Sequence, residues 1–315
     1  MSREEELTLL LKRALGLGTG FEDAESIPHM GKHLVVTTDM LNEGSDFPPG
    51  MPYDAIGWNA VAANLSDIAA AGARPLGLLM ACGFPRNMPD DAIREIATGM
   101  SKCARAHRTR VLGGDLNETD NIILTGTAFG VARYPLHRSG AKPGDMLVVT
   151  GALGASAAGY LIYWSKKERK TELEAGLVRR FNYPVARTAL MAELNAKGLA
   201  NSATDLSDGL ASGVHNICRE SGSGALVEYV GIPLFAGFSE FCRKSGRAEM
   251  ELLNLGSDYE ILASIPQECF GAARKIARRH GGELYEIGTV LKKDVLIEKD
   301  GRIAPLPKTG FAHFG

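Results

Sequence analysis

One pattern recurs along this chain: a short apolar segment runs into an aspartate that stands beside Thr, Ser or Gly. Its instances are Thr37-Thr38-Asp39, Asn64-Leu65-Ser66-Asp67, Gly113-Gly114-Asp115 and Asp205-Leu206-Ser207-Asp208, and Asp23 follows the run Gly18-Thr19-Gly20. Ligand sites of α/β proteins gather where strands end. The pattern therefore predicts a fold of mixed strands and helices that presents acidic groups on short loops.

Apolar periodicity predicts such elements in both halves of the chain. We expect helices over 4–15, 54–71, 89–106, 151–160, 210–221 and 266–280 and within 165–198, and strands over 33–38, 76–84, 109–112, 122–131, 146–150, 203–205, 224–229, 259–264 and 283–298. Residues 133–145 carry two prolines and two glycines between apolar strands, which is typical of a linker. The fold class is therefore α/β (α+β) with two domains, 1–136 and 137–315.

Bulk properties exclude several classes of protein. The length of 315 residues favours two domains, and the net charge of −2 gives no electrostatic case for binding nucleic acid or an anionic membrane. No apolar run approaches the length of a membrane span. The five cysteines are scattered and form no CxxC pair, so we expect a reducing, cytoplasmic compartment.

The aspartates have two interpretations. Carboxylates beside hydroxyl groups suit Mg²⁺, which prefers oxygen ligands, and Mg²⁺ bound with ATP phosphates would relieve the repulsion among gathered carboxylates. Alternatively, each aspartate is a helix cap or turn residue, the commoner role for a single Asp. Asp54 could cap the helix over 54–71, and Asp208 looks like the cap of the helix that begins at Leu210. Spacing alone leaves both interpretations open.

Several longer strings, taken together and in order, resemble the thiamine-monophosphate kinase family of the aminoimidazole-ribonucleotide-synthetase superfamily. The strings are TTDML, AVAANLSDIAAAGARPLG, VLGGD, RSGAKPGDMLVVTGALGASAAG, DLSDG, GSDYEIL and the C-terminal GFAHF. The resemblance implies transfer of the ATP γ-phosphate to thiamine monophosphate with several Mg²⁺ ions. It also implies an N-terminal ATP- and metal-binding domain that pairs in a homodimer, and a C-terminal α/β domain that completes the active site.

The resemblance also assigns roles to residues. The implied metal ligands are Asp23, Thr37, Thr38, Asp39, Asp67, Asp115, Asp205 and Asp208, of which Asp39, Asp115 and Asp208 are the implied catalytic residues. The implied nucleotide contacts are Gly114, Asp115, Arg138 and Ser207. Since the acceptor is a phosphate oxygen that is already anionic, phosphoryl transfer needs positioning and charge neutralisation more than a general base.

This sequence departs from the family pattern mainly on the acceptor side. Glu22 replaces a family Asp, Asp46 stands where the family usually has a His, and Ser257 replaces a Glu. Phe311 stands where the family commonly has Trp or Tyr near the thiamine rings. We expect Asp46, Ser257 and Phe311 to contact the acceptor. The alternatives are a kinase or synthetase of the same superfamily acting on a different small acceptor, and a nucleotide-binding protein without turnover.

Overall fold

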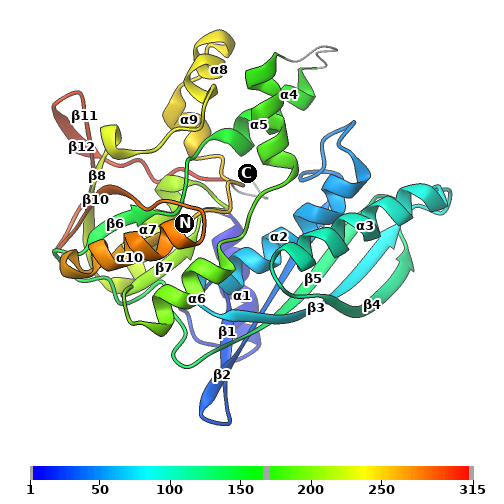
Figure 1. Ribbon diagram of the computed structural model, residues 1–315, viewed down its shortest axis with the longest axis horizontal. Coiled ribbons are helices and arrows are strands. Elements are labelled where there is room, and N and C mark those ends of the chain that lie inside the picture. Colours follow the sequence, from blue (N-terminus) through cyan, green and yellow to red (C-terminus); the bar gives the residue numbers. More distant parts are fainter. Residues whose placement is uncertain (1–2, 166–170, 312–315) are drawn as a thin grey trace.

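The computed structural model describes residues 3–165 and 171–311 and contains two sheets, each with its own helices (Figure 1). Residues 166–170 of the predicted helical stretch and Ala312–Phe314 of the GFAHF string lie outside the described residues. Within the described ranges, no helix is both long enough and apolar enough to cross a membrane.

The first half of the chain forms a five-stranded mixed sheet with the order β1-β2-β5-β3-β4. Its elements are α1 (Arg3–Ala14), β1 (Glu25–His29), β2 (Lys32–Asn42), α2 (Tyr53–Ala70), β3 (Arg74–Phe84), α3 (Asp90–Ala106), β4 (Val111–Glu118) and β5 (Ile123–Ala132). All neighbouring strands are antiparallel except β3 and β4, which α3 connects in parallel.

Helices α2 and α3 cover one face of this sheet (Figure 1). The two helices approach closely because each has a glycine at the crossing. A Cβ atom on Gly57 would lie 1.9 Å from the Ile96 carbonyl oxygen, and one on Gly99 would lie 1.9 Å from that of Asp54. Nearly every side chain of α2 is buried, so this helix is the core of the first half and holds its residues rigidly.

The other face of the sheet is open. Met40 and Leu79 lie on it and are 61% and 41% exposed. Edge strand β4 adds exposed Leu112. An apolar sheet surface of this kind is typical of an interaction face.

The second half forms a seven-stranded sheet with the order β12-β11-β8-β10-β6-β9-β7. Its elements are β6 (Met146–Val149), α4 (Ala155–Trp164), α5 (Glu172–Asn182), α6 (Thr188–Ala196), β7 (Ser202–Asp205), α7 (Leu210–Ser221), β8 (Gly224–Glu228), the 3₁₀ helix η1 (Tyr229–Gly231), α8 (Phe238–Ser245), α9 (Glu249–Leu253), β9 (Ile261–Ile265), α10 (Gln267–Arg279), β10 (Tyr285–Leu291), β11 (Val295–Lys299) and β12 (Arg302–Pro305).

Helix α2 joins the two halves. The Asn59 side chain donates to the carbonyl oxygens of Phe181 (3.3 Å) and Asn182 (2.9 Å), and the Trp58 indole donates to that of Pro184 (2.7 Å). No described helix or strand lies between Ala132 and Met146, although the domain boundary at 136/137 stays a prediction. The two-domain α/β class is confirmed.

Some local predictions are wrong. Strand β4 continues through Gly113, Gly114 and Asp115 instead of ending before them. Asp208 does not cap α7, because Gly209 occupies the N-cap and makes no side-chain bond. Asp54 is likewise no cap: Pro52 is the N-cap of α2, and Asp54 accepts a hydrogen bond from the Tyr183 hydroxyl. Sequence patterns also gave no sign of β1, α8, α9 or β12, each of which has eight residues or fewer.

Candidate active site

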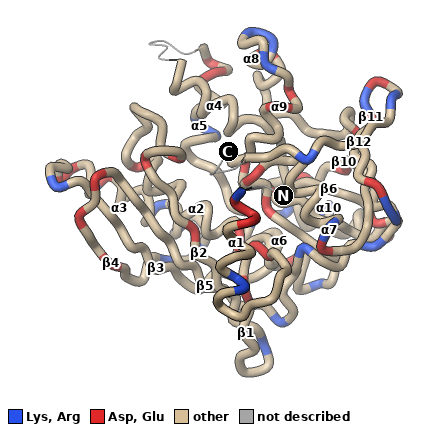
Figure 2. The backbone as a smooth tube through the Cα atoms, turned by 180° about the vertical axis from the view of Figure 1, so that it is seen from behind, with Lys and Arg blue, Asp and Glu red and all other residues tan. Residues whose placement is uncertain are grey.

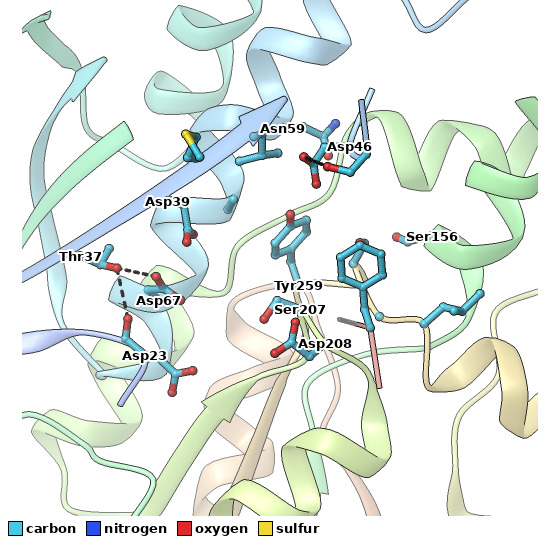
Figure 3. Close-up of a pocket in the computed structure, with 18 of the residues that line it drawn as sticks. Asp23, Thr37, Asp39, Asp46, Asn59, Asp67, Ser156, Ser207, Asp208 and Tyr259 are labelled. Atoms are coloured by element: carbon cyan, nitrogen blue, oxygen red, sulfur yellow. Dashed lines mark hydrogen bonds between the residues drawn. The ribbon is translucent and has the colours of Figure 1, made fainter. Parts of the chain in front are cut away.

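A cavity of about 440 Å³ lies between the two halves of the chain (Figure 3). Most of the aspartates singled out in the sequence line it. The lining residues with predicted roles are Asp23, Thr37, Thr38, Asp39, Asp46, Asp67, Arg138, Ser207, Asp208, Ser257 and Phe311. They come from the loop before β1, from β2 and α2, and from the loops after β2, β5, β7, α9 and β12.

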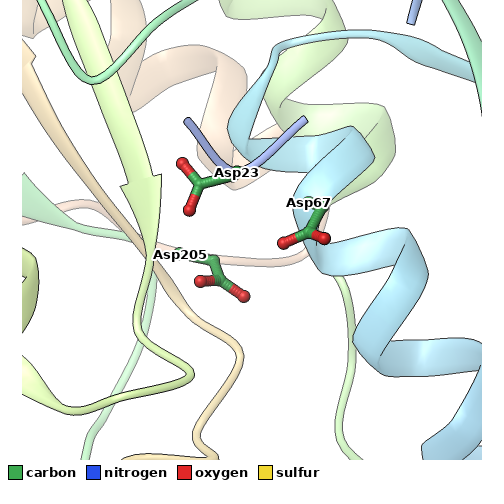
Figure 4. A group of neighbouring side chains, drawn as sticks. All are labelled: Asp23, Asp67 and Asp205. Atoms are coloured by element: carbon green, nitrogen blue, oxygen red, sulfur yellow. The ribbon is translucent and has the colours of Figure 1, made fainter. Parts of the chain in front are cut away.

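Three carboxylates meet at the cavity wall, to which Asp23 and Asp67 contribute. One oxygen each of Asp23, Asp67 and Asp205 lies within 4.8 Å of the other two (Figure 4). Asp67 lies on α2, and Asp205 is the last residue of β7. Oxygen ligands in such a group suit a hard divalent cation such as Mg²⁺.

Hydroxyl groups orient these carboxylates. Thr37 donates to Asp67 at 2.5 Å and to the Asp23 carbonyl oxygen at 3.1 Å. Asp205 accepts from Ser66 and Ser207, both at 2.7 Å. The threonines and serines that precede or follow the aspartates therefore fix the carboxylate positions before any ligand binds.

Burial and mutual repulsion both disfavour ionisation of the cluster. The pKa of Asp39 is raised to about 7, first by burial and then by the charges of Asp205, Asp208 and Asp23. Burial, followed by a neighbouring carboxylate, raises the pKa of Asp205 and of Asp208 to about 6. Burial and three neighbouring carboxylates also raise the pKa of Asp67 well above its usual value. Positive charge in the cavity would relieve this repulsion, so the donor set fits divalent cations.

Arg138 is the only Lys or Arg among the cavity-lining residues that the structure describes. One guanidinium nitrogen donates to Asp23 at 2.6 Å, and the side chain is 15% exposed. Its Nε atom is buried and has no hydrogen-bond partner within the described chain. A buried donor without a partner is expensive, which indicates a site where an anionic oxygen of a ligand completes the geometry.

The residues predicted to contact the acceptor lie on loops at the cavity wall. Asp46 accepts hydrogen bonds from the Asn42 backbone (2.9 Å) and the Ser45 hydroxyl (2.7 Å), so part of its carboxylate is used to hold its own loop. Ser257 donates its backbone N–H to the Ser207 carbonyl at 2.7 Å. Phe311 is 39% exposed and lies beside the cavity. The acceptor role of these residues stays a prediction.

Asp115 and Gly114 do not line this cavity. Asp39 on β2 pairs with Gly126 on β5. Gly126 in turn pairs with Met80 on β3, and Met80 pairs with Gly114 on edge strand β4. Three inter-strand steps of about 4.8 Å place this part of β4 roughly 14 Å from Asp39. Asp115 is paired with Ala81, so its side chain points to the open face of the sheet. Within one chain Asp115 therefore does not meet Asp23, Asp39, Asp67, Asp205 and Asp208, and the metal and nucleotide roles that the resemblance implies for Asp115 and Gly114 stay predictions.

Sequence reasoning missed several residues that line the cavity, among them three polar ones. Asn59 is buried on α2, Ser156 is fully buried on α4 with an unpartnered hydroxyl among the described residues, and Tyr259 lies in the loop before β9. Tyr259 belongs to the quoted string Gly256-Ser257-Asp258-Tyr259-Glu260, but nothing in that string shows where its side chain points. Its location depends on the backbone conformation of the folded loop.

Comparisons with known proteins agree with this two-domain site. The chain matches two family profiles, the AIR synthase related protein N-terminal domain over residues 21–132 and the C-terminal domain over residues 142–300. The thiamine-monophosphate kinase of Pyrococcus horikoshii is 32% identical over 294 residues, which are 93% of this chain and 90% of that protein. That of Aquifex aeolicus is 28% identical over 97% of this chain and 96% of that protein.

Solved structures show the same relationship. The structure described as AaThiL complexed with AMPPCP and TMP superposes with a TM-score of 0.89 at 27% identity, covering 100% of this chain and 99% of that chain. Thiamine-monophosphate kinase from Stenotrophomonas maltophilia superposes with a TM-score of 0.77 at 30% identity, covering 96% of this chain and 98% of that chain. Because the profiles span most of the sequence and the relatives align along nearly all of it, the chain belongs to the thiamine-monophosphate kinase family of AIR synthase related proteins.

Proposed function

We propose that this protein transfers the γ-phosphoryl group of ATP to the phosphate of thiamine monophosphate, giving thiamine diphosphate and ADP. The observation that carries the proposal is the oriented carboxylate cluster in a cavity between the two halves, in a chain of this family. The similar protein AaThiL forms a complex with both AMPPCP, an ATP analogue, and TMP, which supports a site for two phosphorylated ligands.

We further propose that Mg²⁺ is the metal and that more than one ion binds. Its ligands are Asp23, Thr37, Thr38, Asp39, Asp67, Asp205 and Asp208. When bound, the ions supply positive charge that neutralises the phosphates and lowers the barrier to phosphoryl transfer. The shared hydrogen bonds of Thr37 and Ser207 hold the carboxylates in place, so little reorganisation is needed during the reaction.

The chain contributes binding and positioning to this reaction. Arg138 presents an unpartnered Nε and a planar guanidinium, which suits two oxygens of a phosphate group. Ser207 lines the same cavity and is proposed to contact the nucleotide. The acceptor oxygen is already anionic at neutral pH, so no side chain has to remove a proton from it.

Gly114 and Asp115 are proposed to act through a second copy of the chain. Their strand lies at the edge of the sheet, whose open face carries exposed Met40 and Leu79. A homodimer formed through this face would bury apolar side chains and bring Asp115 of one copy toward the nucleotide of the other. This arrangement reconciles the family role of Asp115 with its distance from Asp39 in a single chain.

The remaining cavity wall is proposed to hold the acceptor. Phe311 offers a ring on which a thiazole or pyrimidine can stack, and Asp46 offers a negative charge to the cationic thiazolium. Ser257 has no charge to offer, so its contact would be a neutral hydrogen bond. These three residues define the part of the site in which acceptor identity is decided.

We propose a cytoplasmic location. All five cysteines are unpaired, which fits a reducing compartment. Lys and Arg are dispersed over separate segments such as α8 and the β11–β12 hairpin (Figure 2). Attraction of anionic substrates is therefore expected to depend on bound metal and on Arg138 more than on the overall surface charge.

A product assay tests the proposed reaction. Purified protein is incubated with ATP, Mg²⁺ and thiamine monophosphate, and thiamine diphosphate and ADP are quantified by chromatography, with Asp39→Asn as the inactive control. Equal amounts of both products support the proposal. ADP release with another small phosphate or alcohol, but no thiamine diphosphate, would instead establish a kinase for a different acceptor.

A further inference from the structure

The loop before β9 has an unusual backbone. Gly256, Ser257 and Tyr259 all have positive φ angles, of 80°, 61° and 51°. A Cβ atom on Gly256 would lie 1.9 Å from the Ser207 carbonyl oxygen, so glycine is required there. Ser and Tyr rarely adopt positive φ, and such strain persists only when the surroundings enforce it.

The neighbours of Tyr259 enforce this conformation. The Asp258 carboxylate accepts the backbone N–H groups of Gly154 (2.7 Å) and Ser156 (3.1 Å) at the start of α4. Glu260 is fully buried and accepts from Thr150 at 2.6 Å and from Arg187 at 2.6 and 2.7 Å. With both flanking side chains fixed in the second half of the chain, Tyr259 is directed the opposite way, into the cavity.

Tyr259 stands in the middle of that cavity. Figure 3 shows its ring rising between Asp39 on one side and Asp46 on the other, above Ser207 and Asp208. The residue is 8% exposed, and its hydroxyl makes no hydrogen bond that the described part of the chain provides. A phenol, whose ordinary pKa is about 10, is protonated near neutral pH, so the hydroxyl can donate a hydrogen bond.

The position of Tyr259 separates the two ends of the site. Asp23, Asp39 and Asp67, which are proposed to bind metal, lie on one side of its ring, and Asp46, which is proposed for the acceptor, lies on the other side. If the two substrates bind at these two ends as proposed, the phosphoryl group that passes between them would cross the space in front of the phenolic hydroxyl. A fixed donor aimed at that point stabilises charge where it develops, without reorganising during the reaction.

We propose that Tyr259 is a catalytic residue whose hydroxyl donates a hydrogen bond to an oxygen of the phosphoryl group as it moves from ATP to the acceptor. This inference rests on the proposed function and goes beyond it, because it assigns a donor from the chain itself to the reacting group. The strained loop is then explained by function: it holds one hydroxyl at a fixed point between the two substrates.

The test compares Tyr259→Phe with wild type, using Tyr134→Phe as the matched control because Tyr134 is 68% exposed and outside the cavity. A hydrogen bond to a charged group accounts for a roughly 10- to 100-fold effect on rate, so kcat of Y259F should fall by about that factor. The KM for ATP and for thiamine monophosphate should change by less than about threefold, because the bond strengthens in the transition state. The control should keep wild-type kinetics.

A binding measurement gives a readout that a structural role would not move. Affinity for ADP with Mg²⁺ and aluminium fluoride, a mimic of the transferring phosphoryl group, should fall in Y259F, whereas affinity for AMPPCP should not. Unchanged kcat in Y259F, or equal losses of affinity for both ligands, would overturn the inference while leaving the proposed function standing. A wild-type protein that forms no thiamine diphosphate would instead overturn the proposed function, and this inference with it.

Discussion

Raising the pH should destabilise the metal-free protein. In the folded chain Asp39 has a pKa of about 7, whereas in the unfolded chain it has the ordinary value of about 4. Between these two values the folded protein holds more protons than the unfolded chain does. The free energy of unfolding therefore falls as the pH rises through this interval. A carboxylate stabilised by a salt bridge would have the opposite sign.

Asp39 sets the magnitude of the loss. Raising the pH from about 5 to about 8 covers about two units of the interval below its folded-state pKa, and each unit corresponds to about 1.4 kcal/mol. We therefore expect the free energy of unfolding to fall by about 3 kcal/mol. Asp205 and Asp208, whose pKa values are raised to about 6, increase this loss, while the charge of Arg138 opposes it.

Urea unfolding at a series of pH values, followed by the fluorescence of Trp58 and Trp164, measures this dependence. It is recorded once with EDTA and once with millimolar Mg²⁺. Mg²⁺ binds the ionised cluster only in the folded state, so it should abolish or reverse the loss. Asp39→Asn should flatten the metal-free curve, whereas Asp120→Asn, at an exposed position, should not. A metal-free protein whose stability is constant or rises from about pH 5 to about pH 8 would refute the reasoning.

Three further predictions concern other parts of the site. Arg138→Met leaves the Asp23 carboxylate buried without its cation, so the free energy of unfolding of the metal-free protein near neutral pH, measured with urea, should fall by about 3–5 kcal/mol. A loss no larger than that caused by Arg133→Met, at an exposed position, would contradict the ion pair between Arg138 and Asp23. Phe311→Ala should raise the KM for thiamine monophosphate about 10-fold and leave the KM for ATP nearly unchanged, whereas Phe311→Trp should keep both KM values near those of wild type. Equal increases in the two KM values would show that Phe311 does not contact the acceptor. Asp115→Asn should abolish turnover, and mixing it with Asp39→Asn should restore up to about a quarter of wild-type activity, because about half of the dimers would be mixed and each mixed dimer would contain one intact site of two; no recovery after subunit exchange would contradict a shared site.

The sequence by itself determined most of the elements and the family. The periodic spacing of apolar residues and the continuous apolar runs located α2, α3, β5 and β6. These features are visible in the sequence because they reflect which side chains of a short segment are buried. The ordered strings marked the resemblance, and the profiles and relatives confirm it. The aspartates could be singled out as a group because the alternation of apolar segment and acidic residue is visible without coordinates, and Asp23, Asp39, Asp67 and Asp208 do line one cavity.

The tertiary structure alone decided which aspartates meet. Asp23 and Asp205 are far apart in sequence, yet one oxygen of each lies within 4.8 Å of the other because β7 ends beside the loop before β1. Asp115 carries a similar local signal but points to the opposite face of the sheet, since strand register sets the direction of every side chain. Asp208 faces the cavity instead of capping α7, and Tyr259 enters it through a strained backbone. Such outcomes depend on register, helix packing and long-range hydrogen bonds, and these are set by contacts between distant residues that no local pattern encodes.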